Sequence, residues 1–565
     1  MVNNPKATCQ ILARLLVAHG VKRAVLSPGS RNAPLVAAIS RQEGIKSYVT
    51  IDERAAAFEA LGMAEISGES VAIVCTSGTA LLNYAPAVAE AYYKKLPLIV
   101  VSADRPAEWI DQDDSQTLRQ PGALANFVKR SYNLRAEARD DTQRWWVNRE
   151  INDALTLAQS GVCGPVHINI SIDAPLCPAT PAVGEQRVVT LVEPRLDLTA
   201  SQARWLATEL APPRRVMVVA GFHAPNDAIN RALARMGRMN NVVVLAENLA
   251  NLRFPELISR IDTVLSQIPQ DREANYRPNV VITYGGALVS RLVKRFLRRA
   301  DGVEHWHVGV SDHTIDCFQH LVKRVDVAPE LFFPALASAL YSHRGYSTYA
   351  QLWAALAKDA YASHEGFVAH APWCDLKAFS LMMPALPRNL YLQISNGTAI
   401  RYTQLFDCAS PRLDCNRGVS GIDGSTSTAV GASVVHPNVL ITGDMSAQYD
   451  IGAFSSQQLT SRTRIIVMCN GGGAIFRFVG DTSELPELDR YLAVGVRLPL
   501  EDLCKGYGLT YLSAHDEKSL AKALPRLWQT SDRPVLLAVY TDGILSAEIL
   551  RKYFNRLNTT NLKPS

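Results

Sequence analysis

The chain has 565 residues, a formal net charge of +5, and a composition of 48% hydrophobic and 20% charged residues. This length allows about three to four domains of roughly 150 residues each, and the composition is that of an ordinary globular protein. No basic run is interleaved with aromatic residues, no apolar leader follows Met1, and no apolar stretch is as long as a membrane span. We therefore expect no nucleic-acid partner, no membrane span and a cytoplasmic location. The ten cysteines include no C-x-x-C pair, which argues against a zinc ribbon or a disulfide framework.

Short β-branched runs alternate with helical patterns in the first third of the chain. Strands are predicted at residues 23–27, 47–51, 71–75, 97–102 and 165–170. Such alternation is typical of a doubly wound parallel sheet. A stretch rich in Pro and Ala at residues 173–184 interrupts the pattern and is expected to be a linker.

The same organisation recurs twice. A second series predicts strands at 215–220, 242–246, 280–284 and 305–308, and a third, after a helical connection near 349–361, at 390–394, 439–442, 465–468 and 535–539. We predict an α/β fold of three doubly wound parallel-sheet domains, at residues 1–180, 195–340 and 350–565. The middle domain has no G-x-G-x-x-G after a strand, so bound FAD or NAD is not predicted there, and a structural or a regulatory role stays open.

Oxygen ligands follow two predicted strands of the third domain. Asp444 comes directly after one strand, and Asn470 follows the next and precedes Gly471, Gly472 and Gly473. Ligands bind at strand C-termini in open α/β sheets, and carboxylate and amide oxygens suit Mg²⁺. The spacing resembles the diphosphate-anchoring motif of thiamine-diphosphate enzymes, although Met445 stands where that motif usually has Gly. A plain turn is the alternative.

A carboxylate opens the Ala-rich helix that is predicted after the second strand. Glu53 stands at its start, and a further strand leads to a glycine turn at Gly78 and Thr79. This segment resembles the pyrimidine-binding domain of thiamine-diphosphate enzymes, in which a Glu bonded to N1′ helps the cofactor to lose its C2 proton. Asp52 is the local competitor for that role. For Glu53 alone, a first-turn acid that is stabilised by the helix dipole is the simpler alternative.

Five arginines lie in loops that are expected to converge on the ligand. They are Arg31, Arg105, Arg119, Arg401 and Arg417. The guanidinium fork suits carboxylates, so several such groups around one site would suit substrates that carry two carboxylates each. For any single arginine, a surface ion pair worth about 0–1 kcal/mol is the alternative.

These loops resemble those of the 2-succinyl-5-enolpyruvyl-6-hydroxy-3-cyclohexene-1-carboxylate synthases, thiamine-diphosphate-dependent enzymes of menaquinone biosynthesis. The matching segments are Pro-Gly-Ser-Arg at 28–31, Thr-Ser-Gly-Thr-Ala at 76–80, Ala-Asp-Arg-Pro at 103–106, Arg-Gln-Pro-Gly at 119–122 and the loop at 416–424. The resemblance covers all three domains and implies a fold of the decarboxylase/carboligase type. It implies decarboxylation of 2-oxoglutarate and conjugate addition of the succinyl carbanion to isochorismate, a transferase reaction. It further implies thiamine diphosphate and Mg²⁺ (or Mn²⁺) as cofactors, and a homodimer or dimer of dimers that shares the cofactor between subunits.

The resemblance also implies roles for single residues, of which Glu53 is the catalytic one. Cofactor contacts are implied for Glu53, Thr79, Ile422, Ser446, Asn470, Ile475 and Phe476. Metal ligation is implied for Asp444, Asn470 and Gly472. Substrate carboxylates are assigned to Arg31, Arg105, Gln116, Arg291, Arg401 and Arg417.

Two positions depart from the family pattern. Gly397 follows Asn396 where relatives can carry a serine, which puts a catalytic hydroxyl at this position in doubt. In the middle domain Arg291 is one cation where relatives can have a basic pair, and Lys294 is an uncertain substitute.

Other functions stay in view. An acetohydroxyacid-synthase-like or oxalyl-type decarboxylase would share Glu53, Asp444 and Asn470, but its substrate would not need the arginines. A non-catalytic binding protein would not need Glu53. A metal cluster of His305, His307 and His313 lacks a cysteine or carboxylate partner, and the basic run at 294–299 is interpreted as a solvated helix face.

Overall fold

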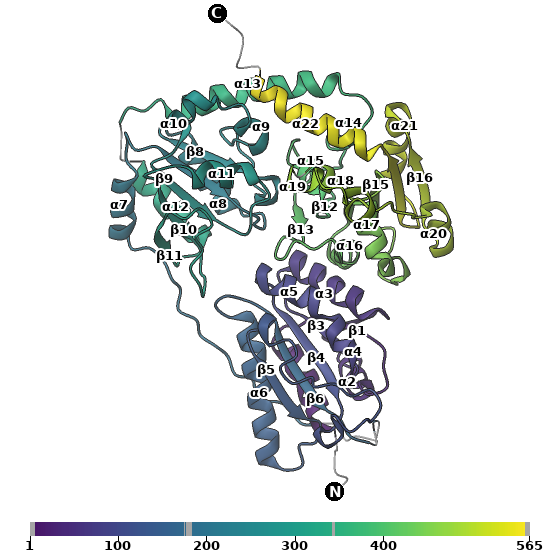
Figure 1. Cartoon of the computed structure of the whole chain (residues 1–565). Coiled ribbons are helices and arrows are strands. Elements are labelled where there is room, and N and C mark those ends of the chain that lie inside the picture. The colour runs from purple at the N-terminus through teal and green to yellow at the C-terminus, as the bar shows by residue number, and fades with distance from the viewer. Residues whose placement is uncertain (1–5, 175, 177–182, 342–344, 479, 560–565) are drawn as a thin grey trace, which may run out of the picture.

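The computed structural model describes residues 6–174, 176, 183–341, 345–478 and 480–559 (Figure 1). It contains three separate parallel sheets of six, five and six strands, so the predicted α/β fold with three parallel-sheet domains is confirmed. The predicted linker at 173–184 lies largely outside the described residues. None of the described helices is long and apolar enough to cross a membrane.

The first domain has the strand order β2-β1-β3-β4-β6-β5. Its strands are β1 Arg23–Leu26, β2 Lys46–Val49, β3 Val71–Cys75, β4 Leu98–Asp104, β5 Ser131–Arg135 and β6 Val166–Ser171. Its helices are α1 Ala7–Ala18, α2 Ala33–Ser40, α3 Glu53–Ser67, α4 Thr79–Asn83, α5 Ala85–Lys94 and α6 Asp141–Gln159. β3 and β4 are buried along their whole length, because helices cover both faces of the sheet. The edge strand β5 was not predicted from the sequence, because its residues alternate between buried and exposed and so form no continuous apolar run.

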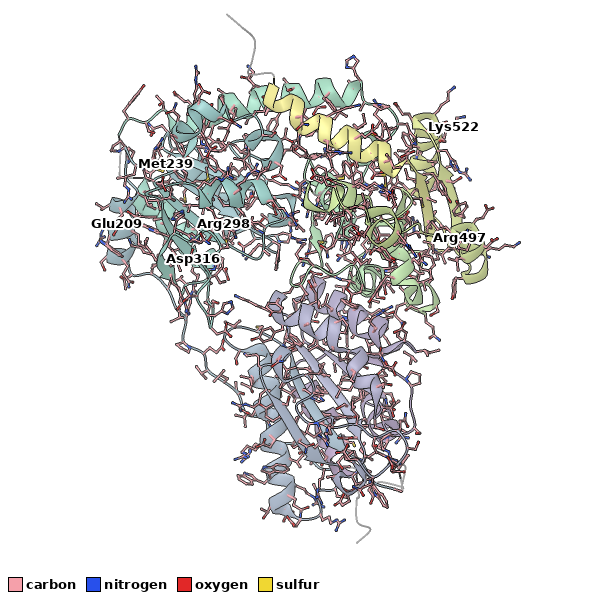
Figure 2. The ribbon with its side chains drawn as sticks, in the orientation of Figure 1. Glu209, Met239, Arg298, Asp316, Arg497 and Lys522 are labelled. Atoms are coloured by element: carbon pink, nitrogen blue, oxygen red, sulfur yellow. The ribbon has the colours of Figure 1, made fainter. Side chains whose placement is uncertain are left out.

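The middle domain has the strand order β11-β10-β9-β7-β8. Its strands are β7 Val216–Ala220, β8 Val242–Ala246, β9 Val280–Tyr284, β10 Glu304–Val308 and β11 Leu321–Val325. Its helices are α7 Ala200–Glu209, α8 Asp227–Gly237, α9 Ile261–Leu265, α10 Glu273–Tyr276, α11 Arg291–Arg298 and α12 Pro329–Leu340. Polar side chains cover its outer surface, among them Glu209 and Arg298 (Figure 2).

The third domain has the strand order β13-β12-β14-β15-β17-β16. Its strands are β12 Tyr391–Ile394, β13 Leu413–Cys415, β14 Asn438–Gly443, β15 Thr463–Cys469, β16 Thr510–Ala514 and β17 Val535–Tyr540. The long helix α13 Tyr349–Ala369 precedes this sheet, and its other helices are α14 Asp375–Met382, α15 Thr398–Thr403, α16 Ser425–Val435, α17 Asp444–Tyr449, α18 Ala474–Phe478, α19 Gly480–Ser483, α20 Leu500–Tyr507, α21 Glu517–Leu527 and α22 Gly543–Thr559. The domain limits that we placed from the sequence stay predictions.

The first and third domains meet where α3 lies against α16 (Figure 1). A Cβ added at Gly62 would lie 2.0 Å from the backbone oxygen of Thr428, and one at Gly431 would lie 1.9 Å from the backbone oxygen of Glu59. Glycine is therefore required at both positions for the close approach of the two helices. This contact fixes how the two domains are oriented within one chain.

Candidate active site

The two predicted metal ligands emerge side by side from the third sheet. β14 and β15 are hydrogen-bonded neighbours, with Gly443 paired to Met468, so Asp444 and Asn470 leave the same edge. The Asp444 carboxylate accepts hydrogen bonds from the backbone N–H of Met445 at 2.8 Å and of Gly471 at 2.9 Å. The carboxylate is thus held directly against the glycine run that follows β15.

The surroundings of Asp444 suit a bound cation. Burial raises the pKa of this carboxyl to about 6, although backbone donors at Met445 and Gly471 lower it. Among the described residues, no lysine or arginine forms an ion pair with Asp444. A hard divalent ion would offset the desolvation of the carboxylate.

Asn470 presents its oxygen toward this edge for a chemical reason. Its Nδ2 donates to the carboxylate of Asp375 at 2.8 Å, so its Oδ1 stays available as a ligand. Gly471, Gly472 and Gly473 all have positive φ angles, of 88°, 84° and 63°, which favour glycine. A Cβ at Gly472 would also lie 2.6 Å from the backbone oxygen of Val494. The donor set therefore fits a cation and a diphosphate.

The predicted cofactor-contacting residues of the third domain surround this edge. The Ser446 hydroxyl donates to the backbone oxygen of Ile422 at 2.6 Å, which places these two residues together at the start of α17. Ile475 and Phe476 lie in the short helix α18 directly after the glycines, and both are partly exposed. Their contact with a cofactor stays a prediction.

Three of the arginines gather between the middle and third domains. Burial lowers the pKa of Arg401, and the nearby charges of Arg291 and Arg417 lower it further. Arg417 donates to Asn396 Oδ1 at 3.0 Å. The Nε atoms of Arg401 and Arg417 are buried and have no hydrogen-bond partner within the described part of the chain. Clustered cations with unsatisfied donors are suited to binding an anion.

Two buried acids border this arginine group, and the sequence patterns did not point to either. Glu247 accepts hydrogen bonds from the backbone N–H of Val289 and Ser290, and Asp262 from the Ser290 hydroxyl. Burial raises the pKa of both carboxyls, and the charge of Arg417 opposes this at Glu247, as that of Arg401 does at Asp262. The pair balances part of the local positive charge and orders the loop before α11.

The predicted site residues of the first domain lie at the ends of its own strands. Arg31 donates to the backbone oxygen of Ile172 at 2.9 Å, and Arg105 forms an ion pair with Asp114 while its Nε stays buried without a partner in the described structure. Gln116 lies beside Gly78, because a Cβ added to that glycine would be 3.3 Å from Gln116 Cγ. Thr79 begins α4 and is exposed.

The structure separates the roles of Asp52 and Glu53. Asp52 caps α3, since its Oδ1 accepts hydrogen bonds from the backbone N–H of Arg54 at 2.9 Å and of Ala55 at 3.2 Å. Glu53 is the first residue of the helix and is half-buried. No hydrogen bond to its carboxylate is found among the described residues. The Asp52 carboxylate is therefore engaged in capping α3. The Glu53 carboxylate, by contrast, is available to another partner.

The predicted site residues form two groups, one in the first domain and one in the third. No hydrogen bond or ion pair in the described ranges joins Glu53, Thr79, Arg31, Arg105 or Gln116 to the site residues of the third domain. The two domains touch where α3 lies against α16 (Figure 1), and at the start of α3, where Arg54 donates to the backbone oxygen of Tyr449 at 2.8 Å. We call the two groups the half-sites of the first and of the third domain.

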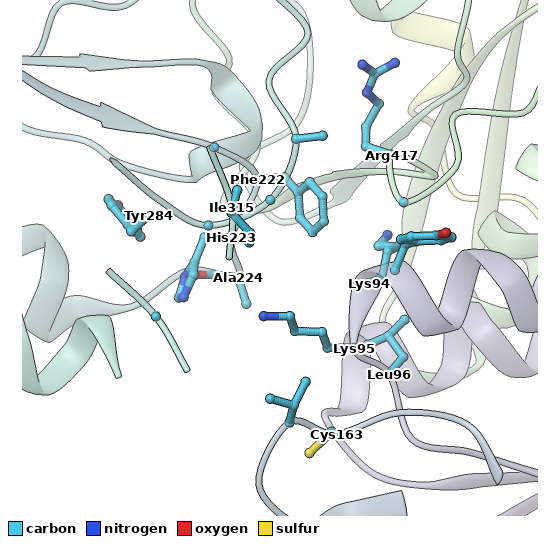
Figure 3. Close-up of a pocket in the computed structure, with 18 of the residues that line it drawn as sticks. Lys94, Lys95, Leu96, Cys163, Phe222, His223, Ala224, Tyr284, Ile315 and Arg417 are labelled. Carbon is cyan, nitrogen blue, oxygen red and sulfur yellow. The ribbon is translucent and has the colours of Figure 1, made fainter. Parts of the chain in front are cut away.

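A cavity of about 890 Å³ lies where the three domains come together (Figure 3). Lys94, Lys95, Phe222 and Tyr284 line it, and Arg417 reaches it from the third domain. Glu53, Asp444 and Asn470 are not among its lining residues. Its wall near β10 includes His307, and the Thr283 hydroxyl is hydrogen-bonded to both His305 and His307. Within the described ranges, no group of three or more His, Cys, Asp or Glu side chains could hold a metal ion.

Gly397 occupies the turn before α15 with φ +91° and ψ −134°. This region of backbone conformation is essentially restricted to glycine. A serine at position 397 would therefore be strained, which explains in conformational terms why glycine rather than a hydroxyl-bearing residue stands here.

Comparison with known proteins connects these features. The family model for the N-terminal TPP binding domain of thiamine pyrophosphate enzymes matches residues 7–123. A 2-succinyl-5-enolpyruvyl-6-hydroxy-3-cyclohexene-1-carboxylate synthase of Porphyromonas gingivalis is 40% identical over 98% of this chain and 97% of its own length. A protein of the same name from Flavobacterium johnsoniae is 36% identical over 98% of this chain and 99% of its own length. The crystal structure of benzoylformate decarboxylase from Polynucleobacter necessarius superposes with a TM-score of 0.70 at 16% identity, covering 95% of this chain and 98% of that one, which shows the fold.

The three-sheet fold and the matched N-terminal domain define a thiamine-diphosphate-dependent enzyme of the transferase type. With relatives of this identity along nearly the whole chain, the protein belongs to the 2-succinyl-5-enolpyruvyl-6-hydroxy-3-cyclohexene-1-carboxylate synthase family. The family resemblance seen in the sequence is thereby confirmed.

Proposed function

We propose that this chain catalyses the reaction of its family, in which 2-oxoglutarate loses CO₂ and its succinyl unit is added to isochorismate. The observation that carries this proposal is the gathering of Arg291, Arg401 and Arg417, because the Nε atoms of Arg401 and Arg417 are buried without a partner in the described structure. Two substrates with two carboxylates each would satisfy these cations. A neutral substrate would leave these buried cations unpaired, which costs free energy.

In this proposal Asp444, Asn470 and the Gly472 carbonyl hold Mg²⁺ or Mn²⁺, which in turn anchors the diphosphate. Thiamine diphosphate, when bound, supplies the electron sink for the decarboxylation. Thr79, Ile422, Ser446, Ile475 and Phe476 would enclose the cofactor. Glu53 would hold the proton at the pyrimidine nitrogen, a role that fits its position as the first residue of α3.

Substrate placement falls to the cationic side chains of both half-sites. Arg401 and Arg417 would receive carboxylates at the third domain, with Arg291 beside them. Arg31, Arg105 and Gln116 would do so at the first domain. Holding two dianions in a fixed orientation lowers the barrier mainly through proximity.

The separate half-sites support a homodimer, or a dimer of dimers, in which the first domain of one chain faces the third domain of another. Val49, Ile51 and Leu82 are 45%, 78% and 43% exposed, and they flank Glu53 and Thr79. Apolar side chains next to a catalytic group would be covered by the partner in such an assembly. We also retain the domain limits 1–180, 195–340 and 350–565 as part of this proposal.

The direct test is CO₂ release from 2-oxoglutarate by the purified protein with thiamine diphosphate and Mg²⁺, with and without isochorismate, followed by mass analysis of the product. Release that increases with isochorismate, together with a product that carries the succinyl unit, is the expected result. Release from pyruvate instead would indicate an acetohydroxyacid-synthase-like carboligase, and no release from any oxoacid would indicate a binding protein.

A further inference from the structure

Asp375 is a buried carboxylate behind the proposed metal site, and none of the sequence motifs includes it. It begins α14, next to α22 (Figure 1), and is 1% exposed. Its carboxylate accepts hydrogen bonds from Asn470 Nδ2 at 2.8 Å and from Thr541 Oγ1 at 2.5 Å. Its backbone N–H donates to Ser546 Oγ at 3.0 Å. One side chain thus links the ends of β15 and β17 to two helices.

No cation balances this carboxylate. None of the ion pairs within the described ranges involves Asp375. An ionised carboxylate without a cation is costly to bury, and here only neutral donors offset that cost. The helix dipole favours an acid in the first turn of α14, but a neutral residue there would avoid the cost of desolvation, so we expect this carboxylate to have a use besides stability.

That use follows from hydrogen-bond chemistry. An ionised carboxylate only accepts, whereas the two ends of an amide differ, one donating and the other accepting. Asn470 must therefore turn its nitrogen to Asp375. The reversed amide would place two oxygens against each other at hydrogen-bond distance. Its Oδ1 is consequently fixed on the opposite side, where the chain places Asp444 and the glycines.

We propose that Asp375 is the positioning residue of the metal site, which selects the one amide orientation of Asn470 that presents an oxygen to the cation. This inference rests on the proposed metal-binding role of Asn470. Asp375 does not itself contact the cation, and it acts only through the Asn470 side chain. Groups that orient metal ligands in this way typically change metal affinity about 10–100-fold when they are removed.

The test compares Mn²⁺ affinity, measured by electron paramagnetic resonance on the full-length protein with thiamine diphosphate, between wild type and Asp375→Asn. The amide introduced at 375 can face Asn470 with either end, so the orientation is no longer selected. We expect Mn²⁺ binding to weaken about 10–100-fold. Asp414→Asn is the matched control, because Asp414 is a buried carboxylate of the same domain that pairs with Arg412 and makes no contact with Asn470. It should keep wild-type Mn²⁺ affinity.

A second variant decides whether the effect is positional or merely structural. In the exchanged pair Asp375→Asn/Asn470→Asp, the amide at 375 donates to a carboxylate at 470, whose second oxygen remains for the metal. We expect Mn²⁺ binding within about threefold of wild type, which an effect through general loss of packing would not restore. This variant also decides the question if Asp375→Asn alone fails to fold.

The outcomes separate the two proposals. Unchanged Mn²⁺ binding in Asp375→Asn, or failure of the exchanged pair to restore it, would overturn the role of Asp375. Absence of thiamine-dependent Mn²⁺ binding in the wild-type protein would instead overturn the metal site of the proposed function.

Discussion

The two half-sites of this chain differ in how far they are completed by their own domain. In the third domain, Asp444 and Asn470 are buried and each is held by hydrogen bonds to neighbouring residues. In the first domain, Glu53 has no hydrogen-bond partner in the described structure, and Ile51, two residues before it, is 78% exposed. The half expected to hold metal and diphosphate is therefore preformed within its own domain, whereas the half expected to carry the acid–base group lacks a hydrogen-bond partner for its carboxylate in the described structure.

The largest effect is expected from the half-site of the first domain. Glu53→Gln keeps the size of the side chain but removes the carboxylate, so turnover should fall about 10²–10⁴-fold. Binding of thiamine diphosphate should be largely kept, because the preformed half is untouched. Steady-state turnover and a cofactor titration measure the two quantities. Near-normal turnover would show that Glu53 is only a first-turn acid of α3.

The arginine group offers the next test, at the border of the preformed half. Arg401→Ala removes a buried cation and should lower kcat/KM for the oxoacid about 10–100-fold, the loss typical of a hydrogen bond to a charged group. Arg298→Ala is the control, because this arginine is exposed and, among the described residues, its one hydrogen bond is to the Cys317 carbonyl oxygen. Equal kcat/KM values for the two variants would show that Arg401 does not bind the substrate.

The contact that orients the two halves within one chain is tested by stability. Gly62→Ala places a methyl group 2.0 Å from the Thr428 backbone oxygen, so we expect a loss of about 3 kcal/mol in the free energy of unfolding. Gly366→Ala is the matched control, since nothing lies within 4 Å of a Cβ at this position in α13. Thermal unfolding should show a lower Tm for the first variant and an unchanged or slightly higher Tm for the second. Equal Tm values would mean that α3 and α16 are not in close contact.

A pH dependence of stability is expected from Glu59, which lies in the contact between α3 and α16. Burial raises the pKa of this carboxyl from 4.5 to about 7, although hydrogen bonds from Ser456, Thr50 and Gln458 lower it. The folded state thus binds more protons than the unfolded state between these values, so the stability contributed by the protonated form is lost as pH rises from 4.5 to 7. Relative to Glu59→Gln, the wild type should lose about 3 kcal/mol across this window, since each pKa unit corresponds to about 1.4 kcal/mol. Parallel pH profiles of Tm for the two proteins would contradict a raised pKa of the Glu59 carboxyl.

The sequence predicted the strands and ligands of the preformed half better than the buried residues that hold those ligands in place. Strands such as β3, β4 and β15 were predictable, because strands covered on both faces are continuous apolar runs. Asp444 and Asn470 follow directly from those strand ends. The edge strands β5, β11 and β16 and the short β13 were missed, since partly exposed or three-residue strands have no continuous apolar run.

The remaining site residues depend on contacts between distant parts of the chain. Asp375 is 95 residues from Asn470 and 166 from Thr541, so no local motif could reveal it. Glu247 and Asp262 likewise owe their position beside the arginines to the packing of the middle domain on the third. The grouping of Arg291, Arg401 and Arg417 was implied only by the family resemblance, because sequence spacing does not place loops of different domains together.

In the proposed homodimer one active site combines half-sites from two chains, and a mixture of two inactive variants tests this assembly directly. Glu53→Gln lacks the acid–base group and Asp444→Ala lacks the metal ligand, so each should be inactive alone. After dissociation and reassembly of an equal mixture, mixed dimers would contain one site with both wild-type residues, and activity should return to about a quarter of wild type. A mixture that stays inactive, although mixed dimers are shown to form, would place the whole site within a single chain and contradict the account.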